Sequence, residues 1–175
     1  MGWSDQDYKK AFSEGHTRNE YVARIVRNEG LWADCPPLKY AKNKDEIKDF
    51  TFGEKDVVTR AGTLEVKGQG KYFTSEPSSF PFSTMIVDTV WSWEGKIEKP
   101  VAYVFVCIEN NECLVVPGST KPQWQVRKLF DNKKKITDSF YVAPKSCLRR
   151  MDDLLSFLRR REMEWNLRGA DCRNE

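Results

Sequence analysis

Histidine is nearly absent from this sequence: His16 is the only one among 175 residues. A Ser/His/Asp site would have to use this residue, and nuclease types that depend on paired histidines are excluded. Because His16 lies in the segment GHTRNE, between a glycine and a possible helix cap, we expect an exposed imidazole in a loop. Any catalysis must then rest on carboxylates, on lysines and on a metal ion where one is bound.

The sequence also lacks a membrane-spanning run, a leader and paired cysteines. No apolar stretch approaches the roughly 18 residues that a membrane span requires, and the N-terminus MGWSDQDYKK has no basic and then apolar leader. The five cysteines form no CxxC pair, which excludes a disulfide framework and a zinc ribbon. These absences predict a soluble protein without contact to a membrane, in a reducing, cytoplasmic compartment.

Apolar residues make up 39% of the chain, enough for one core, so residues 1–175 are expected to form a single domain. Positive charge is concentrated late in the sequence. Between Lys121 and Arg168, thirteen Lys and Arg stand against six Asp and Glu, a net charge of +7, and the total of +3 leaves −4 for the rest. This distribution favours an anionic partner, nucleic acid first, although a solvated helix face explains the charge equally well.

The basic residues fall in two segments: a predicted surface insertion at about 119–139 and a predicted C-terminal helix at about 147–168. Phosphate-binding candidates in the insertion are its lysines and its arginine. A tryptophan between them can stack on a base or, equally well, anchor the loop. These candidates are Lys121, Trp124, Arg127, Lys128, Lys133, Lys134 and Lys135.

Helical patterns occur at both ends of the sequence. We expect a short helix that ends at Gly15 and a second that begins with a capping box formed by Thr17 and Glu20. The last helix is expected from Cys147 to about Arg168, with one apolar stripe along it.

Between these helices the apolar pattern is that of β-strands. The runs DFTFGEKDVVT and TLEVKGQG predict a hairpin, and MIVDTVWSW, VAYVFVCIE, ECLVVPG and the short FYVAP predict further strands. VAYVFVCI is apolar on both faces, as a buried central strand should be. On a strand, Trp91 and Trp93 would share one buried face. The order predicts an α/β (α+β) domain with a central mixed β-sheet flanked by helices.

The hairpin carries the most informative residues of the sequence. Glu65 and Lys67 are two apart and share one face of a strand. If the turn is the two residues Arg60 and Ala61, Asp56 lies opposite Glu65, with Cβ atoms about 5 Å apart. If Gly62 instead makes a three-residue bulged loop, Asp56 turns to the other face. Two carboxylates this close repel each other unless a cation lies between them, and Mg²⁺ or Mn²⁺ takes such oxygen ligands.

Glu20, Asp56, Glu65 and Lys67 together resemble the core motif of the PD-(D/E)xK nuclease superfamily: a helical glutamate, an aspartate on a strand, and Glu-x-Lys on the next strand. The form DVV followed by TLEVKG is similar to the Holliday-junction-resolvase and restriction-endonuclease branches. The motif covers residues 17–70, and the order of strands extends the likeness to Pro117. Two departures are that Lys55 replaces the common proline and that residues 31–49 are longer than a compact version needs.

The resemblance implies a restriction-endonuclease-like core and Mg²⁺- or Mn²⁺-dependent endonuclease activity on DNA, in the manner of nucleases that often act as homodimers. It implies that Asp56, Glu65 and the Val66 carbonyl bind the metal, that Lys67 helps to activate water, and that Glu20 reaches the site through water. Gln69, on the same face as Lys67, would contact the substrate or a water. The alternatives are a capping role for Glu20, ordinary exposed positions for the two acids, and a non-catalytic nucleic-acid- or protein-binding module on the same fold.

Overall fold

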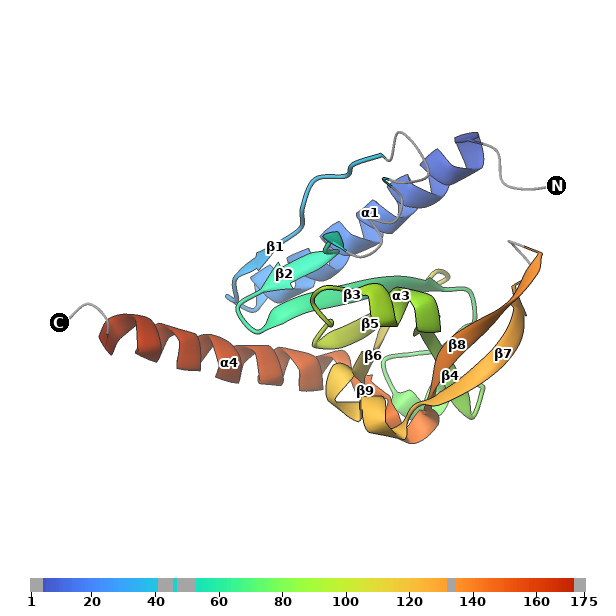
Figure 1. Ribbon diagram of the computed structural model, residues 1–175. Helices are drawn as coiled ribbons and strands as arrows, with labels where there is room; N and C mark the ends of the chain where they lie inside the picture. Colours follow the sequence, from blue (N-terminus) through green and yellow to red (C-terminus); the bar gives the residue numbers. More distant parts are fainter. Residues whose placement is uncertain (1–4, 41–45, 47–52, 132–134, 172–175) are drawn as a thin grey trace.

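The computed structural model describes residues 5–40, 46, 53–131 and 135–171, and it has the mixed α/β architecture that the sequence predicts (Figure 1). A six-stranded sheet has the order β1-β2-β3-β5-β6-β9, and a three-stranded sheet has the order β4-β8-β7. The main elements are α1 (Asp5–Asn28), β1 (Ala33–Asp34), β2 (Val57–Thr59), β3 (Gly62–Gln69), β4 (Thr84–Thr89), α3 (Val90–Gly95), β5 (Ala102–Cys107), β6 (Cys113–Pro117), β7 (Gln125–Asp131), β8 (Ile136–Pro144), β9 (Arg149–Arg150) and α4 (Met151–Asp171). Short 3-10 helices span Pro77–Ser79, Gly118–Gln123 and Lys145–Cys147.

Strand β5 lies inside the larger sheet, parallel to β3 and antiparallel to β6. All six of its residues are buried, which confirms the prediction of a central strand. Side chains alternate between the two faces, so Val104 belongs to one core and Tyr103 and Phe105 belong to the other. Glu65 pairs with Tyr103 and Lys67 with Phe105, and both therefore face the second core.

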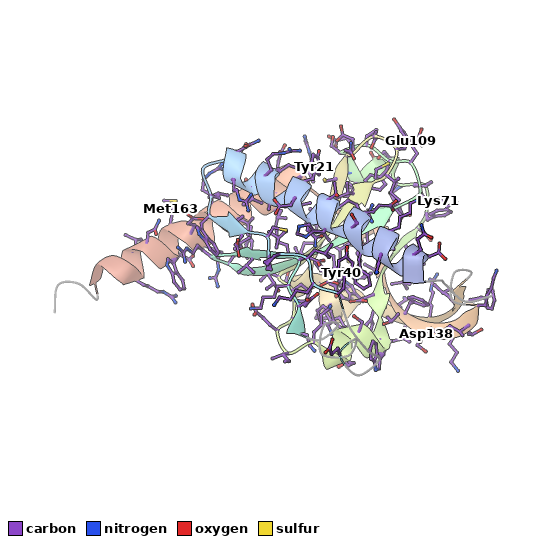
Figure 2. All side chains as sticks on the ribbon, turned by 90° about the horizontal axis from the view of Figure 1, so that it is seen from above. Tyr21, Tyr40, Lys71, Glu109, Asp138 and Met163 are labelled. Carbon is purple, nitrogen blue, oxygen red and sulfur yellow. The ribbon has the colours of Figure 1, made fainter. Side chains whose placement is uncertain are left out.

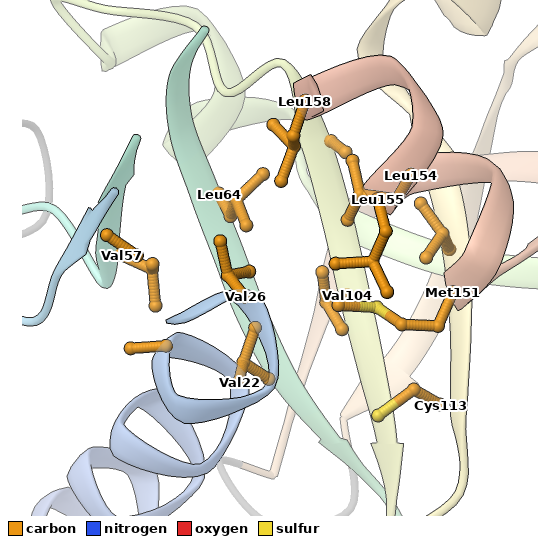
Figure 3. Packing of buried hydrophobic residues seen from close by; sticks show 14 of the residues in the cluster. Val22, Val26, Val57, Leu64, Val104, Cys113, Met151, Leu154, Leu155 and Leu158 are labelled. Atoms are coloured by element: carbon orange, nitrogen blue, oxygen red, sulfur yellow. The ribbon is translucent and has the colours of Figure 1, made fainter. Parts of the chain in front are cut away.

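The first core lies between the six-stranded sheet and the helices α1 and α4 (Figure 3). Helix α1 contributes Val22 and Val26, and α4 contributes its predicted stripe, including Leu155 and Leu158, against Leu64 of β3. Seen from above, α1, which carries Tyr21, lies across this face (Figure 2). The Tyr21 hydroxyl donates to the carbonyl of Asn111, between β5 and β6, at 3.1 Å. The second core lies between the other face of the sheet and the smaller sheet with α3.

Helix α1 is continuous, so the prediction of two helices separated at Gly15 is wrong. Thr17 does not cap a second helix; its hydroxyl donates to the carbonyl of Ser13, 3.0 Å away, one turn earlier in the same helix. A glycine inside a helix costs only about 1 kcal/mol, which the packing of the buried face of α1 outweighs. His16 consequently lies on a helix and is half-buried, not in an exposed loop.

The C-terminal helix begins later than predicted, at Met151 rather than Cys147. Arg149 and Arg150 first pair with β6 as the short strand β9. The Asp153 carboxylate then accepts a hydrogen bond from the Arg150 amide at 3.0 Å, at the start of the helix. The helix continues past the predicted end at Gly169 to Asp171.

The turn between β2 and β3 has the two-residue form that the sequence offers as one of two alternatives. Thr59 pairs with Gly62 and Val57 with Leu64, so Arg60 and Ala61 form the loop. Gly62 has a φ of +125°, and a Cβ there would lie 2.8 Å from a methyl carbon of Val101. Glycine is required at this position because other residues rarely adopt such a φ.

The predicted strand through Trp93 is wrong in its second half. After β4, Thr89 caps α3 by accepting a hydrogen bond from the Ser92 amide at 3.0 Å. Residues two apart lie on different sides of a helix. Trp93 is therefore buried, whereas Trp91 is 51% exposed.

The predicted surface insertion, residues 119–139, contains regular structure on both sides of residues 132–134, which lie outside the described ranges. A 3-10 helix leads into β7, which pairs with β8 from Gln125↔Val142 to Asp131↔Ile136. Figure 1 shows the far end of this β7–β8 hairpin extending away from the rest of the chain. The predicted short strand FYVAP is the end of the longer β8. In the described ranges, no helix has both the length and the apolar character needed to cross a membrane.

Candidate active site

Asp56, Glu65 and Lys67 lie together at the open end of the β2–β3 hairpin. The Lys67 ammonium nitrogen is 2.8 Å from Oε1 of Glu65, as expected for neighbours on one face. Asp56 directly precedes β2, and its Oδ2 accepts a hydrogen bond from the Val66 amide at 2.8 Å. The register of the hairpin and the Val66 amide thus hold Asp56 beside Glu65.

Helix α1 reaches this site through Asn19. Its side-chain amide donates to Oδ1 of Asp56 at 3.0 Å, so both oxygens of Asp56 are hydrogen-bonded. Burial, followed by the negative charge of Glu65, raises the pKa of Asp56 to about 7, although the Val66 amide, Lys67 and Asn19 act in the opposite direction. The Asp56 carboxylate is therefore costly to ionise in this position.

A second lysine completes the surroundings of Glu65. Lys96, which follows α3, lies 3.2 Å from Oε2 of Glu65. The two lysines also approach Asp88 of β4, with nitrogen to oxygen distances of 3.8 Å for Lys67 and 4.0 Å for Lys96. The side chains of Lys96 and Asp88 are only 7% and 6% exposed, whereas Lys67 remains 34% exposed. Glu65 and Asp88 are thus bridged by two ammonium groups.

Asp88 is also fixed by hydrogen bonds. Its Oδ2 accepts from the hydroxyl of Tyr103 at 2.8 Å and from the hydroxyl of Ser92 at 3.1 Å. Its Oδ1 accepts from the Thr89 amide at 2.9 Å. Burial and the charge of Asp88 raise the pKa of Tyr103, so this phenol stays a hydrogen-bond donor.

The charges in the cluster support each other. Burial alone would raise the pKa of Glu65, but Lys67 and Lys96 outweigh it and lower that pKa. Burial alone would lower the pKa of Lys67, but Glu65 and Asp88 raise it above its ordinary value. Glu65 is therefore ionised and Lys67 protonated at neutral pH.

Two hollows meet at Asp56. One, of about 500 Å³, is lined by Asn19, Asp56 and Val66 together with parts of α1 and of the segment after β1. The other, of about 140 Å³, is lined by Asp56, Glu65 and Lys96. Both carboxylates therefore border space that a small ligand can enter.

Glu20 is not brought to this cluster. It lies one position after Asn19 on α1, and its carboxylate is 3.6 Å from the guanidinium of Arg27. Because successive helical residues point about 100° apart, only Asn19 of this pair faces Asp56. The capping role is not observed either, since Thr17 lies inside the helix.

Gln69 lies farther along β3 than Lys67 and is half-buried. Its side chain is held at both ends: the amide nitrogen lies 3.5 Å from the Met85 sulfur, and the oxygen accepts from the Lys71 amide at 3.1 Å. These two contacts fix the orientation of the Gln69 side chain at the end of β3.

Trp124 and Lys121 belong to the second core and its edge. Trp124 is 8% exposed, and its indole N–H donates to the hydroxyl of Thr120 at 2.9 Å. The Lys121 nitrogen lies 3.8 Å from the centre of the Tyr141 ring. Of the two roles that the sequence left open for Trp124, stacking on a base does not fit this placement, whereas anchoring the segment does.

The other basic candidates lie on the β7–β8 hairpin. Arg127 and Lys128 are exposed on β7, and Lys135 is exposed in the turn, with a φ of 56°. Lys133 and Lys134 lie outside the described residues. The hairpin therefore carries exposed positive charge on one projecting element.

Sequence reasoning missed Asn19, Asp88 and Lys96. Asp88 had a signal, because it is the only charged residue in the apolar run MIVDTV and a charge within such a run needs a buried partner. Lys96 had no comparable signal in a polar stretch, and Asn19 was hidden beside the more conspicuous Glu20.

Comparisons with known proteins do not assign this geometry to a family. No protein-family model matches the chain, and no curated protein matches it in sequence. A function for the site therefore rests on the chemistry of its own residues.

Proposed function

We propose that this protein is a metal-dependent nuclease that hydrolyses phosphodiester bonds in DNA, with Asp56, Glu65 and Lys67 as its catalytic residues. The observation that carries the proposal is that Asp56 and Glu65 border the same accessible space, while the ammonium group of Lys67 lies 2.8 Å from Glu65. An acidic pair with an amine next to it is suited to holding a cation against phosphate.

The donor set fits a hard divalent cation. Asp56 is a carboxylate whose pKa is raised to about 7 by burial and by Glu65, and a cation between the two acids would relieve both effects. Mg²⁺ or Mn²⁺ would be held by Asp56, Glu65 and the carbonyl of Val66. The metal would supply a Lewis acid that polarises the phosphate and lowers the pKa of water.

The protein's own side chains would position and stabilise the reacting groups. Lys67 is held by Glu65 at 2.8 Å and keeps a third of its side chain exposed, so its ammonium group can donate to a phosphate oxygen or to the attacking water. Such a preorganised charge stabilises the negative charge that develops on phosphate. Lys96 and Asp88 keep Glu65 and Lys67 in place.

DNA would be bound through its backbone by exposed cations. The β7–β8 hairpin presents Arg127, Lys128 and Lys135, which can contact phosphates without reading sequence. Trp124 and Lys121 support this hairpin from the core side.

Cleavage of plasmid and short duplex DNA with and without Mg²⁺ tests this function. We expect Glu65→Gln and Lys67→Met each to reduce the cleavage rate by about 100-fold or more, because each removes a charge that acts on the reacting phosphate. Glu109→Gln changes an exposed carboxylate on the turn after β5 and should cleave at the rate of the unchanged protein. Full activity in both site variants would refute the catalytic assignment.

One observation favours a second candidate, a non-catalytic nucleic-acid-binding module. Both oxygens of Glu65 already have lysine partners, so the cluster is stable as an ion-pair network by itself. In that case DNA binding should weaken with salt, and Mg²⁺ should produce no cleavage. Arg127→Ala should lower the affinity for DNA more than Glu65→Gln does.

A further inference from the structure

We propose a second metal site, specific for Zn²⁺, formed by His16, Glu20 and Cys35. One ligand atom of each side chain lies within 4.8 Å of the other two. The Cys35 sulfur and Nδ1 of His16 are 4.0 Å apart. None of the three ligands belongs to the proposed catalytic set of Asp56, Glu65 and Lys67, and the site does not depend on the proposed nuclease activity.

Local structure explains why these three residues meet. His16 and Glu20 are four residues apart on α1 and therefore share one face of the helix. Cys35 directly follows β1, which pairs with β2. Arg27 of α1 donates to the Ala33 carbonyl at 2.8 Å, and this bond holds the end of the strand against the helix.

The distances suit a small tetrahedral ion. Bond lengths of about 2.0–2.3 Å to nitrogen, oxygen and sulfur place two ligands of such an ion about 3.5 Å apart. Small side-chain rotations would close the gap from 4.0 Å between Cys35 and His16. Glu20 is exposed and pairs with Arg27 only at 3.6 Å. Its carboxylate already accepts a hydrogen bond from the Cys35 thiol, so it is within reach of a metal bound beside that sulfur.

The ligand types select the metal. A thiolate and an imidazole are the ligands that zinc prefers, whereas Mg²⁺ takes oxygen ligands and keeps several waters. Cys35 is 8% exposed and His16 is half-buried, so an ion bound here would be partly shielded. Three protein ligands leave a fourth position for water, the arrangement of an open zinc site.

Zinc at this position would shape the wall of the larger hollow. His16 lines the same space of about 500 Å³ as Pro36, which follows Cys35, and as Asp56. A metal bond from α1 to Cys35 would therefore fix the segment after β1 against the helix. Zn²⁺ binding would therefore act directly on the structure of the segment that lines the hollow.

Zn²⁺ competition titration and Co²⁺ spectroscopy of the metal-free protein, residues 1–175, test this site. We expect one Zn²⁺ per chain, and a Co²⁺ form with a thiolate-to-cobalt charge-transfer band and the intense visible bands of four-coordinate cobalt. Cys35→Ser should remove the charge-transfer band. It should also weaken Zn²⁺ binding by at least about 100-fold, since even partners of metal ligands cost 10–100-fold.

Controls separate this site from other thiols and from the nuclease site. Cys147 is also buried, and Cys147→Ser should keep both the band and the affinity. Asp56→Asn should also keep them, whatever its effect on cleavage. Glu20→Gln, an exposed change that does not threaten folding, should weaken Zn²⁺ binding while the thiolate band remains. A charge-transfer band that survives Cys35→Ser, or spectra of six-coordinate cobalt without thiolate, would overturn the site.

Discussion

Replacing Asp88 by alanine should lower the free energy of unfolding by about 3–5 kcal/mol, the usual cost of removing one partner from a buried ion pair. The Asp88 side chain is 6% exposed and lies between Lys67 and Lys96. Without it, Lys96 keeps only Glu65 as an anionic partner in this cluster. The hydroxyls of Tyr103 and Ser92 also lose their acceptor. Urea denaturation followed by circular dichroism measures the change.

A matched surface pair provides the control for Asp88. Glu98 pairs with Lys55, and both side chains are more than 40% exposed. Glu98→Ala should cost less than about 1 kcal/mol, because solvent screens an exposed pair. Asp88→Asn should be intermediate, since it keeps hydrogen-bonding atoms and loses only the charge. Equal costs for Asp88→Ala and Glu98→Ala would show that the buried cluster has no special weight in stability.

Replacing Asp56 by asparagine should stabilise the metal-free protein at pH 8 and abolish its cleavage of DNA. Burial and Glu65 raise the pKa of Asp56 from 3.8 to about 7 in the folded state, so the folded state binds this proton more tightly than the unfolded state. The associated stability is present below about pH 4 and is lost as the pH rises to about 7. The loss amounts to about 4 kcal/mol at most. Asparagine carries no charge, so Asp56→Asn avoids this loss of stability.

Hydrogen bonding does not oppose this substitution. The oxygen of an asparagine at position 56 can accept from the Val66 amide, and Asn19 can turn its own oxygen toward the new amide. Urea unfolding at pH 5 and pH 8 should show a difference between the variant and the unchanged protein that grows with pH. Mg²⁺ should reduce this difference by stabilising only the unchanged protein.

The exposed carboxylate of Asp34 gives a comparison for the Asp56 experiment. Asp34→Asn should leave both the pH dependence and the response to Mg²⁺ unchanged. If Asp56→Asn destabilises the protein equally at both pH values, the charge of Asp56 is not costly in the folded state and the argument for a cation beside it fails.

The parts of the fold that sequence predicts well are those fixed by local pattern. The alternation of Leu64 and Val66 with Glu65 and Lys67 sets which face of β3 is polar, and the two-residue loop before Gly62 sets its register. These two local facts bring Asp56, Glu65 and Lys67 together. The all-apolar run of β5 likewise predicts a central strand.

Features that depend on distant contacts were not predictable in the same way. Gly15 suggested the end of a helix, but the packing of Val22 and Val26 keeps α1 intact. Trp93 followed an apolar run with strand character, but the cap at Thr89 turns the chain into a helix. The approach of Lys96 to Asp88 was not predictable from the sequence either, because helix α3 lies between the two residues and brings them together.

The parallel pairing of β3 with β5 has a consequence for how the site is assembled. More than thirty residues separate the two strands, and this crossover delivers both Asp88 and Lys96 to Glu65. The hairpin that carries Asp56 and Glu65 can form early, because its contacts are close in sequence. Asp88 and Lys96 follow the hairpin in the sequence. During synthesis they can therefore reach Glu65 only after the chain has been extended through the crossover. The local hairpin thus supplies Asp56, Glu65 and Lys67, whereas the two residues that fix their charges, Asp88 and Lys96, depend on the crossover.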